Sequence, residues 1–295
     1  VAGNTVLGES ALDASVSGGN NTAIGLSALS AHTSGTANTA VGQNAMILNT
    51  TGTENSAFGA IALDANTTGD KNTAIGRSAL GSNTTADSNT AVGYNSLLAN
   101  TTGTVNLAIG VDAGKTQTTA NNCVWIGTEA GRDNTATNNV AVGNGAMRLN
   151  TTGHRNTAVG TGVYGSSHGA LSANTTGARN CAFGLQALLA NTTGDANTAL
   201  GAETMVNNTT GGSNVAVGRD ALAANTTASN NTAVGTDALE ANTTGAFNVA
   251  VGTNALDANT TASELTGIGF KALTDNTTGE NNTAIGSHAL ENNTT

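Results

Sequence analysis

The chain has 295 residues, of which 9% are charged and 2% aromatic, and it contains 39 glycines and no proline. A net charge of -10 argues against binding to nucleic acid or to an anionic membrane surface, because both reward clustered Lys and Arg. The chain has too few large apolar side chains for an ordinary globular core and, at 38% hydrophobic residues, too many for a disordered segment. No stretch reaches the roughly 20 apolar residues of a membrane-spanning helix.

A marker glycine recurs every 17 residues from Gly8 onward. The period loses one residue before Gly143, gains seven residues after Gly160, and then holds to Gly286. The 17 units share the approximate consensus N-T-A-V/I-G-x-x-A-L-x-x-N-T-T-G-x-x. A short fixed period of this kind is typical of a solenoid in which each unit forms one coil.

Each unit has an apolar residue directly before its marker glycine, and two residues earlier stands Thr, Val, Leu, Ser or Cys. This spacing predicts a short strand, with the residue before the glycine facing the core. Leu or Met stands four residues after most marker glycines, and we expect a second short strand there. The predicted core residues are Ile24, Val41, Phe58, Ile75, Val92, Ile285, Leu29, Leu63 and Leu222.

The residue two before the marker glycine is Ala in 14 units. Strand alternation predicts that it points away from the core. A row of methyl groups on the outside suggests the close approach of another surface, which we expect to be a second copy of the chain; the alternative is a small residue facing solvent. The predicted interface includes Ala40, Ala57, Ala74 and Ala91.

Two rows of asparagine also follow the repeat. Asn tolerates left-handed backbone and bonds to nearby backbone in turns, and identical stacked side chains bond to one another as ladders. We therefore interpret both rows as structural ladders. Four members of each row are Asn38, Asn55, Asn72 and Asn89, and Asn49, Asn66, Asn83 and Asn100.

A single coil buries too little to be stable alone, whereas stacked coils share a core and a ladder of backbone hydrogen bonds. The absence of proline fits, because proline donates no hydrogen bond to a ladder. We predict an all-β parallel β-solenoid of about 17 coils, continuous over 1–295. Irregular coils are expected at 111–148 and an outward insertion at 161–169. Since both ends lie inside the repeat, we expect the natural polypeptide to be longer.

Few residues suggest a ligand or catalytic site. Trp125 and Tyr164 are about two coils apart, which suggests an aromatic patch for sugar; the alternative is local repacking. Cys123 and Cys181 are three coils apart, too far for an intrachain disulfide. Structural calcium near Asp64 and Asp257 stays open, and no other cofactor, metal site or catalytic residue is predicted.

The motif N-T-A-I-G, at 21–25 and 282–286, resembles the N-S-V-A-I-G head repeats of trimeric autotransporter adhesins of the YadA type. The longer unit is similar to repeats in bacterial and phage proteins that carry tail-fibre domains. The resemblance covers nearly the whole chain, although the adhesin heads commonly use a shorter repeat. It implies a left-handed β-roll and three chains side by side in a fibre at a cell or virion surface.

These features together predict a structural or adhesive extracellular fibre segment and no enzymatic activity. Its expected partners are further copies of itself, as a trimer or filament, and a host surface glycan or receptor. Nucleic acid is not expected as a partner, and no membrane span is expected in this segment. An ice-binding or glycan-binding solenoid is the alternative, and a polysaccharide-cleaving solenoid is disfavoured because no paired carboxylates stand on one face.

Overall fold

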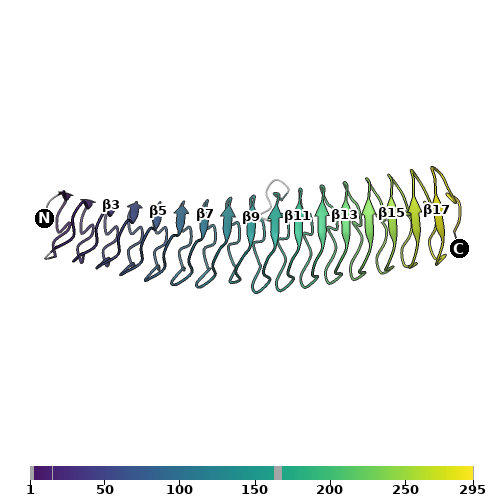
Figure 1. Cartoon of the computed structure of the whole chain (residues 1–295). Coiled ribbons are helices and arrows are strands. Elements are labelled where there is room, and N and C mark those ends of the chain that lie inside the picture. Colours follow the sequence, from purple (N-terminus) through teal and green to yellow (C-terminus); the bar gives the residue numbers. More distant parts are fainter. Residues whose placement is uncertain (1–2, 15, 163–167, 295) are drawn as a thin grey trace. The chain divides into compact units, whose positions relative to one another are not determined.

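The computed structural model describes residues 3–14, 16–162 and 168–294. All regular secondary structure in these ranges is β: 17 parallel strands, each of three residues, form a β-solenoid with one strand per coil (Figure 1). No helix occurs in them, and therefore none long enough to cross a bilayer. The predicted all-β parallel solenoid is confirmed.

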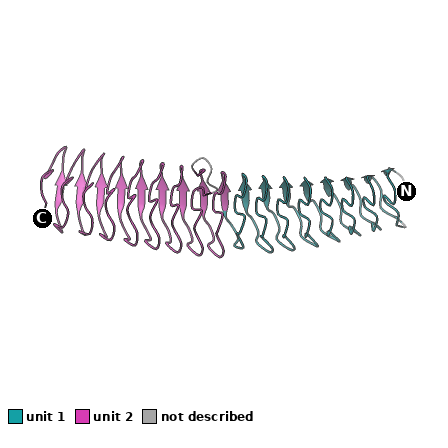
Figure 2. Cartoon of the chain, turned by 180° about the vertical axis from the view of Figure 1, so that it is seen from behind, with its two compact units in different colours: residues 1–139 teal, residues 140–295 magenta. Residues whose placement is uncertain are grey.

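The chain divides into two compact units, residues 1–139 and 140–295 (Figure 2). The first unit contains strands β1 (Thr5–Leu7), β2 (Thr22–Ile24), β3 (Thr39–Val41), β4 (Ser56–Phe58), β5 (Thr73–Ile75), β6 (Thr90–Val92), β7 (Leu107–Ile109) and β8 (Val124–Ile126). The second contains β9 (Val140–Val142), β10 (Thr157–Val159), β11 (Cys181–Phe183), β12 (Thr198–Leu200), β13 (Val215–Val217), β14 (Thr232–Val234), β15 (Val249–Val251), β16 (Thr266–Ile268) and β17 (Thr283–Ile285).

Within each unit every strand pairs in parallel with the strand one coil away, at the same repeat position. In the pairing of β3 with β4, for example, Ala40 lies opposite Ala57 and Val41 lies opposite Phe58. Equivalent side chains therefore form straight rows along each unit. The backbone between the strands also forms hydrogen bonds between adjacent coils, as in the donation from Leu29 N to Ala45 O at 3.1 Å.

The middle residue of each strand faces the interior, and the two outer residues face out. The prediction for the strand rows is therefore wrong in direction: Ala40, Ala57, Ala74 and Ala91 are fully buried and are not an outer interface. The apolar residues before the marker glycines lie on the outside. Ile24, Val41 and Val92 are half-buried, whereas Phe58 and Ile75 are each 41% exposed and Ile285 is 70% exposed.

The interior is too narrow to hold two large side chains per coil. Leu29, Leu63 and Leu222 are fully buried, as predicted from the sequence, and they occupy the wall opposite the strand. At Gly267, which replaces the middle alanine of β16, an added Cβ would lie 3.1 Å from Cγ of Leu256. The leucine row and the alanine row thus fill the interior together, and Ile or Phe in the middle of a strand would collide with leucine.

The second strand predicted after each marker glycine does not form. That segment is a series of turns in which alternate residues have positive φ, for example Ser27 at 55° and Leu29 at 53°. An extended strand requires negative φ throughout. The backbone N–H groups of these left-handed residues point alternately toward the previous and the next coil, since Ser27 N donates to Glu9 O and Leu29 N to Ala45 O.

Both asparagine rows are buried ladders. Asn38 donates from Nδ2 to Asn21 Oδ1 in the preceding coil (3.1 Å) and to Gly52 O (2.8 Å). In the second row Asn66 donates to Asn49 Oδ1 (2.8 Å) and to Gly69 O (3.0 Å). All eight asparagines named from the sequence are fully buried. All of their side-chain amides are hydrogen-bonded except for Asn100 Oδ1, which has no partner. Buried polar groups are normally paired in this way.

The marker glycine is required by its backbone conformation. At Gly76 φ is 128°, and an added Cβ would lie 2.5 Å from the carbonyl oxygen of Gly93 in the next coil. Side chains are almost excluded from that conformation. The second glycine of the repeat is just as close to the next coil, since an added Cβ at Gly69 would lie 2.4 Å from Ala86 O, but its φ is not positive, and several coils carry a buried alanine there, including Ala86 and Ala120.

We expect Gly76→Ala to lower the free energy of unfolding by about 1–3 kcal/mol more than Gly69→Ala does, through backbone strain at positive φ. Gly69→Ala is the matched control, because the following coil already carries Ala86 at that position. Urea unfolding followed by circular dichroism measures both. Equal losses of stability in the two variants would contradict this account of the marker glycine.

Candidate interaction surface

The outward residues of the strands form one continuous surface in each unit, here called the strand face. It consists of the first and third residue of every strand, and none of these residues is buried. The first-position row is mainly Thr. The third-position row is apolar in every strand and includes Phe58, Phe183 and Leu200, which are 41%, 36% and 51% exposed. Half-buried and exposed apolar side chains thus recur coil after coil on one side of each unit.

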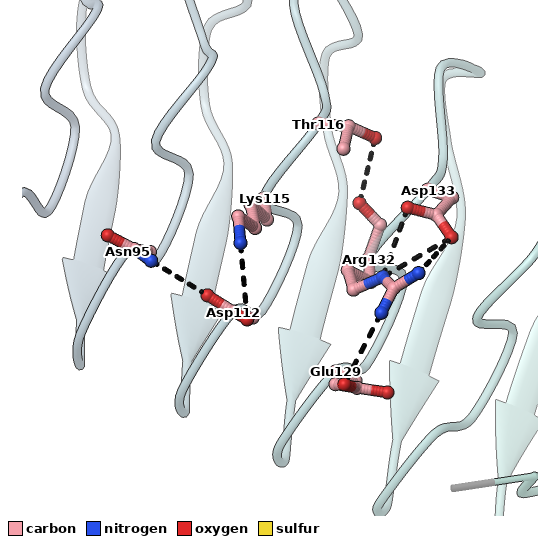
Figure 3. A network of polar contacts seen from close by, with 7 residues as sticks. All are labelled: Asn95, Asp112, Lys115, Thr116, Glu129, Arg132 and Asp133. Atoms are coloured by element: carbon pink, nitrogen blue, oxygen red, sulfur yellow. Dashed lines mark hydrogen bonds and ion pairs between the residues drawn. The ribbon is translucent and has the colours of Figure 1, made fainter.

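No charged side chain occurs on the strand face in any of the 17 strands. The acidic and basic residues of the described ranges lie on the turns instead. Figure 3 shows one such group on the turns that follow β6, β7 and β8. There Lys115 pairs with Asp112 at 3.3 Å, and Arg132 pairs with Asp133 at 3.0 Å.

The same turns in the second unit carry a line of carboxylates. Burial raises the pKa of Asp257, and the carboxylates of Asp237 and Asp275 raise it further. The pKa of Glu240 is also raised, chiefly by burial and then by Asp257, Asp237 and Asp220. The ion pair of Arg219 with Asp237 (3.4 Å) offsets only part of this repulsion. The turns are therefore a negatively charged side of the second unit, distinct from the uncharged strand face.

Trp125 does not form a ligand patch, because it is fully buried in the middle of β8. Its indole Nε1 donates to Gln117 Oε1 at 2.9 Å. Gly114 and Gly131 replace the core leucine in two coils, and an added Cβ would lie 2.6 Å and 2.2 Å from the Trp125 ring. Trp125 therefore fits the alternative interpretation, in which the core repacks locally around it. Tyr164, the other member of the predicted patch, lies outside the described residues.

Both cysteines are free. Cys123 is buried in the first asparagine row, where burial raises the pKa of its thiol to about 11. Its backbone N–H still forms the hydrogen bond of the ladder, by donating to Asn106 Oδ1 at 3.0 Å. Cys181 is half-buried in the first-position row of the strand face. The thiols thus belong to different environments, one in the core and one on the surface.

Within the described ranges, no group of three or more His, Cys, Asp or Glu side chains is arranged to hold a metal ion. Asp64 and Asp257, the residues considered for calcium, lie in different units. His32 is buried in the second asparagine row and contacts Gly35 O at 2.8 Å and Asn49 Nδ2 at 3.1 Å. His288 lies on a turn, 2.6 Å from Glu291.

The strand face is the functional candidate that the sequence reading missed. The signal was present, because the residue before the marker glycine is apolar in every unit but varies among Val, Ile, Leu and Phe, whereas the residue before it is the small Ala in 14 units. Period-two alternation shows that two rows face opposite ways, but it does not show which row is inside. In comparisons with known proteins, no family model matches the chain and no curated protein sequence matches it.

A double-mutant cycle tests the repacking around Trp125. Gly114→Leu should be destabilising by about 1–3 kcal/mol through overpacking, and Trp125→Ala by about 3–5 kcal/mol through the cavity it leaves. The double variant restores Ala in the strand and one of the two missing leucines, while Gly131 stays glycine. We expect it to be more stable than the sum of the two losses predicts, with a coupling free energy of about 1–3 kcal/mol. Additive losses in urea melts would contradict the compensation.

A pH series tests the line of carboxylates. Raised folded-state pKa values mean that wild-type stability rises as the pH falls through them and levels off below the unfolded value near about 4. Glu240→Gln/Asp257→Asn should therefore raise the free energy of unfolding at pH 7, by up to about 1 kcal/mol, and have no effect at about pH 3. Exposed Glu264→Gln is the control, expected to be neutral at both. A gain that persists at low pH would contradict the electrostatic cause.

Proposed function

We propose that this chain is a structural segment of an extracellular fibre at a cell or virion surface, whose work is rigidity, reach and multivalent display. The observation that carries the proposal is the pair of buried asparagine ladders. Each ladder links one coil to the next through side-chain hydrogen bonds, in addition to the backbone bonds between strands. Within a unit, no coil can open without breaking bonds to its neighbours.

The ladders support a load-bearing role because they act along the axis of each unit. Asn72 illustrates this. Its Nδ2 donates to Asn55 Oδ1 (3.1 Å) and Ala86 O (2.8 Å), and its Oδ1 accepts from Asn89 N (3.0 Å). One side chain therefore connects three successive coils. Buried hydrogen-bond groups are costly to leave unpaired, so separating coils requires the loss of several bonds at once.

Repetition supports display. The outward positions recur at about 4.8 Å intervals along each unit, so any weak contact made by one coil is offered again by the next. Linked weak contacts combine into strong binding when the partner is itself repetitive, as a surface glycan or a receptor array is. The resemblance to adhesin and tail-fibre repeats points to the same setting. No enzymatic activity is proposed.

Single-molecule pulling from the two ends of the segment tests the mechanical role. We expect resistance at low force and then unfolding in steps that are multiples of one coil, each releasing about 55 Å of chain. Asn72→Ala should lower the unfolding force and the free energy of unfolding by about 3 kcal/mol, because it leaves several buried groups unpaired.

Asn207→Ala is the control for the ladder variant. Asn207 is exposed, and other coils carry alanine at the same position, for example Ala65 and Ala99. Its unfolding force should equal that of the wild type. Gradual extension of the wild-type segment at low force, without steps, would overturn the proposed load-bearing role.

A further inference from the structure

We propose that His32 is an acid-sensitive point of the first unit, where uptake of a proton opens the coil that carries it. His32 occupies a position of the second asparagine row and is fully buried. Its Nε2 lies 2.8 Å from Gly35 O, and its Nδ1 lies 3.1 Å from Nδ2 of Asn49 in the next coil. The inference concerns the fold itself and does not depend on the proposed fibre role.

The two contacts define the protonation state of the His32 ring. A backbone carbonyl accepts hydrogen bonds and an amide nitrogen donates them, so Nε2 carries a hydrogen and Nδ1 carries none. A ring with this arrangement is neutral, because an imidazolium has a hydrogen on both nitrogens. Protonation in the closed coil would place an N–H of the ring against an N–H of Asn49.

The amide of Asn49 cannot turn over to resolve this conflict. Its Nδ2 also donates to Gly52 O (3.2 Å), and its Oδ1 accepts from Asn66 Nδ2 (2.8 Å). A turned amide would bring oxygen against the carbonyl of Gly52 and nitrogen against the nitrogen of Asn66. Because the same two donations recur at Asn66, Asn83 and Asn100, the whole row would have to reverse.

The ring has no room to move away and no carboxylate to balance a positive charge. A Cβ added to Gly35 would lie 2.6 Å from Cε1 of the imidazole, so the ring packs directly against the turn. The coil of His32 contains no charged residue, and the two adjacent coils contain Glu9, Asp13 and Glu54. All three are exposed, and none is hydrogen-bonded to or paired with the imidazole in the described structure. A buried cation without a partner costs considerable free energy.

Acid therefore favours the open form of this coil. An exposed imidazole takes up a proton below about pH 6.5, whereas the closed coil holds the ring neutral. The open form then binds more protons, so the stability of the closed coil is complete above that pH and falls as the pH falls below it. The carboxylates of the second unit act in the opposite direction, because their raised pKa values stabilise that unit in acid. The two effects are separated when individual coils are measured.

Hydrogen exchange of the full chain, measured peptide by peptide with mass spectrometry, tests the inference. His32→Asn is the matched control, because it restores the asparagine that most coils carry. After correction for the intrinsic pH dependence of exchange, we expect wild-type protection of residues 26–42 to fall between pH 7.5 and pH 5. The fall should exceed that of the control by up to about 30-fold, the limit for one imidazole protonated only in the open form. His288→Asn removes an exposed imidazole and should leave the wild-type fall unchanged.

His32→Gln is a second variant with a precedent in the chain. Gln117 stands at the same position of the second asparagine row and donates to Ala120 O at 3.1 Å. Protection in this variant should follow that of His32→Asn. An equal fall in the wild type and both variants, or no fall in any of the three, would overturn the inference.

Nitrogen NMR of the His32 ring separates protonation from stability, with the signal assigned by its loss in His32→Asn. At pH 7.5 we expect a hydrogen on Nε2 and none on Nδ1. The opposite tautomer would overturn the inference. A ring that becomes charged in acid while residues 26–42 keep their protection would overturn it as well.

Discussion

The structure depends on the satisfaction of two buried asparagine amides in almost every coil. Asn38 and Asn49 are fully buried, and unpaired amides in that environment would each cost about 1–3 kcal/mol. Asn38 donates to the equivalent Asn21 and to Gly52 O, whereas Asn49 donates to His32 Nδ1 and Gly52 O and accepts a hydrogen bond from Asn66. This constraint explains the strict repeat, because only a neighbour with the same spacing presents its amide at the right height.

The changes in repeat length occur between the ladder positions. The 16-residue unit is shortened between Asn134 and Asn139, and the side chains of these two residues bond to each other at 3.1 Å. After Gly160 the inserted residues are bypassed, since Ala170 N donates to Gly160 O at 3.3 Å as Ala28 N does to Gly25 O. Where Cys123 replaces asparagine, its backbone N–H preserves the bond to the preceding coil. The chain varies in length only between its ladder positions.

Trp125 shows how far the interior can change when its volume is kept. The indole fills the space that leucine side chains occupy elsewhere, and glycine stands at both neighbouring leucine positions. The substitution extends to the ladder, because Gln117 turns its carbonyl oxygen to the indole and its amide to Ala120 O. Asn100 Oδ1, which a ladder asparagine would otherwise have paired, has no partner in the structure. The core accommodates the tryptophan, and the ladder loses the hydrogen bond to Asn100 Oδ1.

The sequence by itself determined the class of fold, one coil per 17 residues, the leucine row of the core and the position of both asparagine rows. Each of these follows from a local requirement that recurs in every unit. Only the tertiary structure decided which side of the strand is inside, because alternation is symmetric and Ile24 is more hydrophobic than Ala23. The width of the interior decides which side faces in. The turn segment after Gly25 places Leu29 across from the strand, and the space left beside it holds only the methyl group of Ala23. The apolar row is consequently displaced to the surface, where the sequence alone would not place it.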